Sequence, residues 1–321
     1  MKNKIMAAAL SAVLALGVMA GCAQKKDDTV VRVGSLKGPT TIGVVNLMDK
    51  AAKGTSEGKY EFTMSAAPDE ITAKVVSGEL DIALVPANLA SVLYNKTEGN
   101  ITAIDINTLG VLYCVTGDSS VTSVADLAGK KVITTGQGAT PEYSLRYLLD
   151  QNGITDCEIE FRSESTEVAA VLSEDPSQIA VLPQPFVTVA CAQNEALASA
   201  FSLEEAWELS TGGLGMVTGV TIVRNDFLKA HPEAVKTFIK EHGESVNAAN
   251  SDLDTTAALV VEKEIIGKEP LAKKAIPACN IVCMTGDSLK NNLAAYLEVL
   301  YNSDPKSVGG KLPGDEFYYK G

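Results

Sequence analysis

The sequence predicts an α/β fold of two lobes, each with a mainly parallel sheet flanked by helices. The first observation is a repeat: GSLKGPTTIG at 34–43 and GQGATPEYSL at 136–145 each follow a β-branched run and begin an apolar-periodic segment. The second is that both copies continue to a buried-looking strand that ends in proline, at Pro86 and at Pro183. The third is that the alternation of strands and helices stops after residue 215.

Within each copy the same order of elements is expected. The first copy predicts strands at 29–33, 61–65 and 81–88, a helix capped by Thr40 or Thr41, and a helix at 68–78. The second predicts a helix capped by Thr140 with Pro141 in its first turn, strands at 157–163 and 178–185, and a helix at 165–172. Threonine suits the cap and proline the first turn of a helix. Any two α/β segments look broadly alike, but the shared order, spacing and terminal prolines favour a true repeat.

The last third of the chain predicts a return to the first lobe. A strand-like run at 215–228 is followed by helical segments at 231–250, 254–265 and 287–301. Helices alone cannot form a third lobe of the same kind, so we expect two crossings, near 109–116 and 215–223. The expected lobes are 30–112 plus 218–321, and 113–217. Ligands bind at the carboxyl ends of such strands, so the facing ends should form a cleft and the crossings its hinges.

The N-terminus predicts export. Lys2 and Lys4 precede the uncharged run 5–20, which is shorter than a comfortable membrane span and typical of a signal peptide. It ends at Met19-Ala20-Gly21-Cys22, which resembles a bacterial lipobox. We expect a signal peptide at 1–21, lipidation at Cys22 and a tether at 22–29, with an ordinary cleaved signal as the alternative. Two or more acyl chains anchor a protein stably, which places it on the outer face of the cytoplasmic membrane.

Charge and residue types exclude several classes of function. The formal net charge is −13, and removal of two lysines with the signal makes it more negative, which argues against nucleic-acid binding. His231 and His242 lie on one apparently polar helix, too far apart for a metal pair or a catalytic base. The remaining cysteines show no basic partner in sequence and are interpreted as buried thiols, although their redox state is left open: Cys114, Cys157, Cys191, Cys279 and Cys283. We therefore expect no catalytic residue, no cofactor and no metal.

Several stretches together resemble one family. They are the lipobox, the 34–43 loop, SGELDIALVPAN, DLAGKKVITTGQGATPEY, LPQPFV and VTIVRNDFLKAHPEAVKTF. These resemble extracytoplasmic solute-binding lipoproteins of ABC importers, nearest the sulfonate, taurine, nitrate and thiamine-pyrimidine-precursor branch. The resemblance implies a two-lobed, periplasmic-binding-protein-like fold of type II and closure on a small solute. It also implies a monomer that delivers the solute to a membrane permease with a cytosolic ATPase.

Helix N-termini at the strand ends predict where a polar or anionic solute binds, because they offer free N–H groups and a positive dipole end. The expected ligand-binding residues are Ser35, Lys37, Gly38, Thr40, Thr41, Ala67, Pro86, Ala87 and Asn88 in one lobe, Gln137, Gly138, Thr140, Ser163, Ser165 and Gln184 in the other, and Tyr113 at a crossing.

Several of these residues have structural alternatives. The threonines and Asn88 can be helix caps, and the glycines can serve turns with positive φ. Lys37 and Arg162 are either partners of the solute or members of exposed salt bridges. Gln184 lies between two prolines, and the sequence suggests no structural role for it. Trp207 is predicted to be a helix-packing residue.

Three functions stay open at this point. A binding protein for a permease and one for a sensor would have the same pocket, and the identity of the solute is not determined. Some relatives of this branch are pyrimidine-synthesising enzymes, but the export signal and the absence of catalytic motifs argue against an enzyme.

Overall fold

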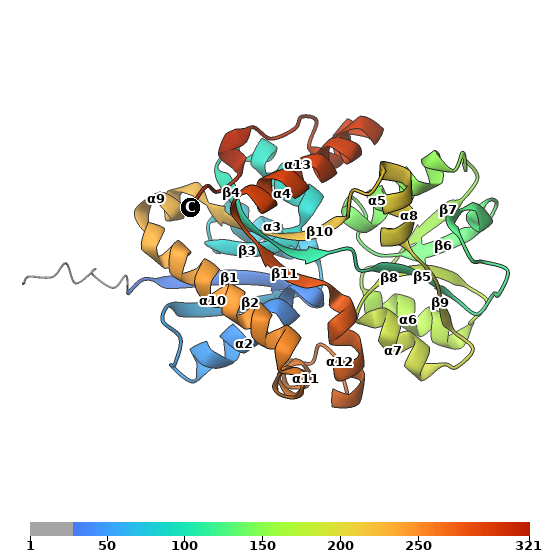
Figure 1. The fold of residues 1–321 in the computed structure, drawn as a ribbon, viewed down its shortest axis with the longest axis horizontal. Helices are drawn as coiled ribbons and strands as arrows, with labels where there is room; N and C mark the ends of the chain where they lie inside the picture. The colour runs from blue at the N-terminus through green and yellow to red at the C-terminus, as the bar shows by residue number, and fades with distance from the viewer. Residues whose placement is uncertain (1–27) are drawn as a thin grey trace, which may run out of the picture.

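The computed structural model describes residues 28–321. The expected signal peptide and the lipidation residue Cys22 lie outside the described residues. Within 28–321, no helix is both long and apolar enough to cross a membrane. The described chain forms two sheets, each covered by helices, that lie side by side along the long axis of the molecule (Figure 1).

The first sheet has six strands in the order β11-β4-β10-β3-β1-β2. Its strands are β1 (Val30–Leu36), β2 (Lys59–Ser65), β3 (Ile82–Pro86), β4 (Ile101–Leu109), β10 (Val217–Arg224) and β11 (Ile281–Met284). Strand β1 pairs in parallel with β2 and β3. Strand β10 is antiparallel to β3 and β4, and β11 is antiparallel to β4. We call this sheet and the helices on it lobe 1.

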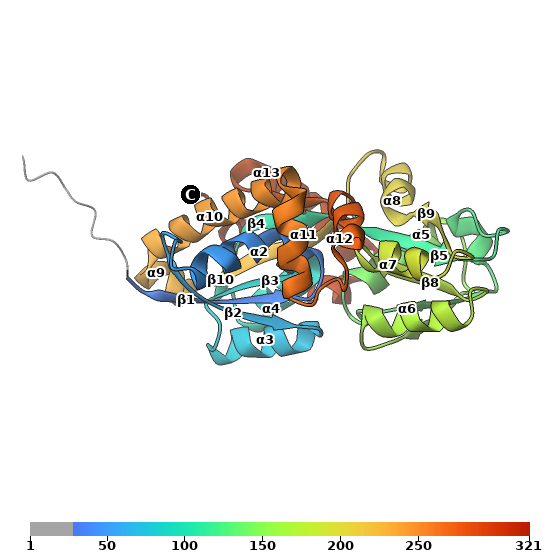
Figure 2. The same ribbon diagram turned by 90° about the horizontal axis from the view of Figure 1, so that it is seen from below.

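Helices cover both faces of the lobe 1 sheet. Figure 2 shows α3 on one side of it and α10 on the other. The helices are α2 (Pro39–Ala52), α3 (Pro68–Ser77), α4 (Ala87–Lys96), α9 (Asn225–Ala230), α10 (Pro232–Ser251), α11 (Leu253–Glu262), α12 (Glu269–Ala275) and α13 (Gly286–Ser303). Short 3-10 turns lie at Ile276–Cys279, Pro305–Val308 and Asp315–Phe317. The α2–α10 pair buries Val44, Leu47 and Phe238 against the sheet.

The second sheet has five strands in the order β7-β6-β8-β5-β9. They are β5 (Leu112–Thr116), β6 (Lys131–Thr134), β7 (Glu158–Phe161), β8 (Ile179–Pro183) and β9 (Ala198–Ser202). Its helices are α5 (Thr140–Gln151), α6 (Ser165–Glu174), α7 (Phe186–Gln193) and α8 (Leu203–Thr211), with a 3-10 turn at Val124–Leu127. We call this sheet and its helices lobe 2.

The predicted repeat and fold class are confirmed. The order β3-β1-β2 in one sheet matches β8-β6-β7 in the other, and all four pairings are parallel. The sheets are nevertheless mixed and not mainly parallel. Strand β10 enters lobe 1 from lobe 2 and β5 enters lobe 2 from lobe 1, so each runs against its neighbours. The chain crosses between the sheets at 110–111 and again after α8, close to the expected positions.

Two other expectations about packing have opposite outcomes. Trp207 is a packing residue as predicted, fully buried between Tyr147 and Tyr296 with ring centroids 4.6 and 5.2 Å away. The prediction of a polar helix around the histidines is wrong, because His242 is fully buried on α10. The view that no cysteine has a basic partner is also wrong, since Cys283 lies beside His242. Both errors arise because α10 is buried along the side that packs on α2 and β11.

Two of the stretches that carry the family resemblance, SGELDIALVPAN and VTIVRNDFLKAHPEAVKTF, meet at Asp81. This carboxylate is 2% exposed and accepts hydrogen bonds from the backbone N–H of Arg32 and from the guanidinium groups of Arg32 and Arg224. Burial alone would raise the pKa of Asp81, but the bonds from both arginines outweigh it and lower that pKa. Asp81 therefore links β1, the start of β3 and the end of β10.

Substitution Asp81→Asn should destabilise the protein by about 3 kcal/mol, because it leaves two guanidinium groups facing a neutral amide. Urea unfolding at pH 7 measures the loss. Asp226→Asn is the matched control, since Asp226 pairs with the same Arg224 from an exposed position, and we expect less than about 1 kcal/mol from it. Equal effects of the two substitutions would contradict the central role of Asp81.

Candidate functional site

A cavity of about 130 Å³ lies between the lobes, at the carboxyl ends of the repeated strands. Lobe 1 lines it with Leu36, Lys37, Pro39, Thr40, Ala66, Pro68, Pro86 and Thr108, the crossings with Val111, Leu112 and Thr218, and lobe 2 with Thr135, Gly136, Ala139, Thr140, Pro141, Ser163, Glu164, Ser165 and Pro183. Most of these side chains are apolar or carry a hydroxyl group. Lys37 and Glu164 are the ionisable residues among them.

The turn after β1 uses its hydroxyl groups internally. Helix α2 starts at Pro39 with Gly38 before it, at a φ of 143° that favours glycine. Thr40 and Thr41 both donate to the carbonyl oxygen of Leu36, at 2.9 and 2.6 Å. Ser35 is fully buried and bonds the Thr41 hydroxyl at 2.7 Å. The expectation that a threonine caps α2 is wrong, because both threonines lie within its first turn and turn back to β1.

The turn after β6 differs from prediction in the same way. Helix α5 begins at Thr140 with Ala139 before it, so Thr140 is not a cap. Its hydroxyl donates to the Asn88 side chain of lobe 1 at 3.3 Å. The backbone N–H of Gly138, which we expected to be free for a solute, donates to the Glu142 carboxylate at 2.7 Å.

Acidic side chains also occupy two other helix starts at the cavity. Glu167 accepts from the Ser163 N–H at 3.1 Å. Glu70 accepts from the Ser65 hydroxyl, which in turn accepts from the Ala67 N–H. A carboxylate at a helix start offsets the positive end of the helix dipole. These starts are therefore weaker anion sites than the sequence suggested, and an anionic solute stays a prediction.

Six of the predicted binding residues line the cavity: Lys37, Thr40, Pro86, Thr140, Ser163 and Ser165. The others lie outside its lining: Ser35, Gly38, Thr41, Ala67, Ala87, Asn88, Tyr113, Gln137, Gly138 and Gln184. Gln184 does have a structural task, since its side-chain Oε1 accepts from the Thr188 hydroxyl at 2.8 Å in the first turn of α7. Arg162 forms a salt bridge with Glu160 on β7.

Sequence reasoning missed the residues beside the crossings. Thr108, Val111, Leu112 and Thr218 line the cavity next to the points where the chain passes between the lobes. The Thr218 Oγ1 is buried and has no hydrogen-bond partner within the described residues. Unpartnered buried hydroxyl groups are uncommon and costly. Because Thr218 also lines the cavity, its hydroxyl is a candidate partner for a solute there. Its place in a strand-like run gave no signal of a position at the cavity.

Asn88 joins the two lobes directly. Its side-chain NH₂ donates to the Gly138 carbonyl of lobe 2 and to the Ser307 carbonyl of lobe 1, both at 3.0 Å. A second contact joins Ser144 on α5 to the Tyr296 hydroxyl on α13 at 3.0 Å. The lobes are thus in hydrogen-bonded contact beside the cavity, and Asn88 acts between them and not on its lining.

Substitution Asn88→Ala should open the lobes of the unliganded protein. It removes the bonds of Asn88 to Gly138 and Thr140 of lobe 2, worth about 1 kcal/mol each, so the closed population should fall roughly thirtyfold relative to the open one. Small-angle scattering measures the expected rise in radius of gyration. The control is Ser91→Ala, which loses a buried bond to Val308 inside lobe 1. Unchanged scattering of Asn88→Ala would show that Asn88 does not hold the lobes together.

Glu204 lies where both crossings pass. Its carboxylate oxygens accept from the Met216 N–H at 3.2 and 3.0 Å, just before β10. It also packs on Gly110, where any Cβ would collide with the carboxylate. Burial raises the pKa of Glu204 from 4.5 to about 7, although the Met216 N–H opposes the rise.

This raised pKa predicts a loss of stability with rising pH. The folded protein binds the Glu204 proton more tightly than the unfolded chain, so the stability that this proton provides disappears as pH rises from about 5 through 7. Glu204→Gln should remove that decline and stabilise the protein at pH 8 by about 1 kcal/mol, a value reduced for partial solvent screening. Thermal unfolding at pH 5 and pH 8 tests this, with exposed Glu205→Gln as control. A parallel decline in wild type and Glu204→Gln would contradict it.

The two lobes, the two crossings and the cavity between them form a fold that is also seen in solved periplasmic binding proteins. A family described as menaquinone biosynthesis matches residues 38–276, and the chain belongs to this family. No curated protein matches the sequence.

Solved structures agree on the fold. An ABC transporter from Parabacteroides distasonis is similar at 23% identity, with a TM-score of 0.75 over 91% of this chain and 99% of that one. The periplasmic aliphatic sulphonate-binding protein SsuA from Escherichia coli is similar at 13% identity, with a TM-score of 0.70 over 91% and 92% of the two chains. The alkanesulfonate-binding protein SsuA from Xanthomonas axonopodis pv. citri, bound to MOPS, follows at 12% identity, with a TM-score of 0.69 over 89% and 94%. The predicted resemblance is confirmed for the fold.

Proposed function

We propose that this protein is the solute-binding component of an ABC importer and not an enzyme. The observation that carries the proposal is the cavity between two hydrogen-bonded lobes, lined by both lobes and by residues beside the crossings. A solute there touches both lobes, so its binding energy favours the closed arrangement. The proteins with similar structures that are described as sulphonate-binding support the same role.

The mature protein in this proposal is a monomer anchored by lipid at Cys22 to the outer face of the cytoplasmic membrane. Its partners are the permease subunits and their ATPase. A sensor as partner is the alternative, because either partner would read the same closed form. The proposed lobe boundaries are 30–112 plus 218–321, and 113–217.

The solute in this proposal is a small organic molecule with an apolar body and at least one hydrogen-bonding group. The body rests on Val111 and Leu112, and the polar group binds the unpartnered Thr218 hydroxyl. Lys37 supplies the positive charge among the lining residues and meets any negative group of the solute.

Native mass spectrometry of residues 23–321, purified gently and then denatured, tests the proposal. A released small molecule, bound one to one, would support it and identify the solute. An empty protein is next screened by thermal shift against sulfonates, carboxylates and pyrimidines. Failure of the whole panel to stabilise the protein would count against the proposed solute site.

Substitution Thr218→Val should weaken binding of the identified solute three- to tenfold, because it removes one neutral hydrogen bond of about 1 kcal/mol while keeping the side-chain shape. Isothermal titration calorimetry measures the change. Thr218→Ser keeps the hydroxyl group and should bind within about twofold of wild type. Equal affinity of wild type and Thr218→Val would remove Thr218 from the site.

A second candidate function is favoured by the family match over 38–276. In this alternative the same cavity holds a substrate of menaquinone biosynthesis. Incubation of the protein with excess of the identified solute separates the two functions. Recovery of the solute unchanged supports a binding protein, whereas its conversion to a product of different mass supports an enzyme.

A further inference from the structure

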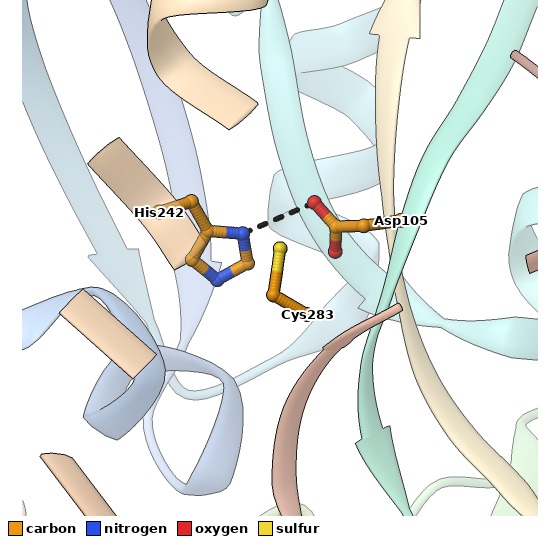
Figure 3. Close-up of side chains that lie close together, drawn as sticks. All are labelled: Asp105, His242 and Cys283. Carbon is orange, nitrogen blue, oxygen red and sulfur yellow. Dashed lines mark hydrogen bonds and ion pairs between the residues drawn. The ribbon is translucent and has the colours of Figure 1, made fainter. Parts of the chain in front are cut away.

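Three side chains that are far apart in the sequence meet inside lobe 1. Asp105 comes from the central region of β4, His242 from α10 and Cys283 from the edge strand β11. One donor atom from each lies within 4.8 Å of the other two. Figure 3 shows the Cys283 sulfur directed toward the gap between the His242 ring and the Asp105 carboxylate. None of the three lines the cavity between the lobes.

Two residues of the cluster are shielded from solvent and the third is partly exposed. Asp105 and His242 are fully buried, and the His242 Nδ1 lies 3.0 Å from the Asp105 Oδ2. Cys283 is half-buried, so it is the one of the three residues that is partly exposed to solvent. A buried pair with one ligand near solvent offers an ion both a dry site and a route of entry.

Neighbouring side chains hold the carboxylate in place. The Thr221 hydroxyl on β10 donates to the Asp105 Oδ1 at 2.6 Å, and the Asn107 side chain donates to Thr221 at 3.1 Å. These bonds leave the Asp105 Oδ2 directed at His242. An outer layer of hydrogen bonds that orients a ligand carboxylate is a regular feature of metal sites in proteins.

The geometry points to a binding site for a single divalent cation of the zinc type, held by Asp105, His242 and Cys283. Carboxylate, imidazole and thiolate are the ligands that Zn²⁺ takes in proteins, at bond lengths of about 2.0 to 2.3 Å. Tetrahedral bonds of that length place donor atoms about 3.5 Å apart, within the spread of the present cluster.

The charges of the site also match a divalent cation. The carboxylate and the thiolate carry one negative charge each, and the imidazole binds in its neutral form. Binding forms one bond to each side chain, and the protons displaced from the thiol and from the ring pass to solvent. The bound site is then neutral, which suits its burial.

A cation at this place would act on the fold of lobe 1 and not on the solute. It would join the edge strand β11 and the long helix α10 to β4. An edge strand of four residues has little pairing of its own, so it gains most from such a link. The inference does not depend on the proposed transport function.

The test uses the mature protein, stripped with a chelator, dialysed and then loaded with Zn²⁺. We expect one bound zinc per chain by elemental mass spectrometry and a rise in melting temperature. Loading with Co²⁺ should give a thiolate-to-cobalt absorption band, which reports on sulfur ligation directly. Cys283→Ser should bind zinc at least tenfold more weakly and lose the band. Cys157→Ser, a half-buried cysteine of lobe 2, should keep both properties.

Two results would overturn the inference. One is a wild-type protein that takes up no stoichiometric zinc, which would make the cluster a buried Asp105–His242 ion pair with a thiol packed beside it. The other is equal zinc affinity and an unchanged cobalt band in Cys283→Ser, which would place the ion elsewhere. His242→Gln provides the second variant: circular dichroism first verifies its fold, and it should also bind zinc at least tenfold more weakly.

Discussion

The buried carboxylate of Asp81, held by two arginines, is the interaction on which the geometry of lobe 1 depends. It joins the starts of β1 and β3 to the end of β10. The same three strands reach the cavity at their other ends, through Leu36, Pro86 and Thr218. Because paired strands keep a common register, fixing them at one end sets the relative position of their other ends. The Asp81 contacts therefore help to build a site at the far ends of the strands, which the first family stretch reaches through Pro86.

The second constraint is the path of the chain between the lobes. Strand β10 returns from lobe 2 and pairs antiparallel with β3. This pairing places Thr218, near the start of β10, beside Pro86 at the end of β3. The Glu204 carboxylate contacts both crossings, at Met216 and at Gly110. Its protonation state therefore affects the segments that connect lobe 2 to lobe 1. The lobes then meet through Asn88 beside the cavity. The contact between the lobes, the cavity and the packing of the crossings are consequently neighbouring features of one region, whereas the Asp105 cluster does not line that cavity.

Much of the architecture was predictable, because it depends on local patterns. The strand–turn–helix repeat, the prolines that end β3 and β8, the crossings and the packing of Trp207 follow from periodicity and turn residues, and the structure confirms them. The helix starts were located within a few residues, but the threonines were misread as caps. A threonine in the first turn can bond to the preceding strand as well as to its own helix, and only the fold determines which bond forms.

The sequence by itself determined the fold class, the duplicated topology and the strand ends at which a cavity forms, since these depend on residues close together in the chain. Tertiary structure alone decided which side chains face that cavity, that Glu142 already occupies the Gly138 N–H, and that Asn88 bridges the lobes. It also brought Asp105, His242 and Cys283 together, and it buried a histidine on a helix that looked polar. Apart from the local Glu142–Gly138 bond, these contacts join distant parts of the chain: 50 positions separate Asn88 from Gly138, and 137 separate Asp105 from His242. No local pattern encodes which distant side chain will arrive beside them.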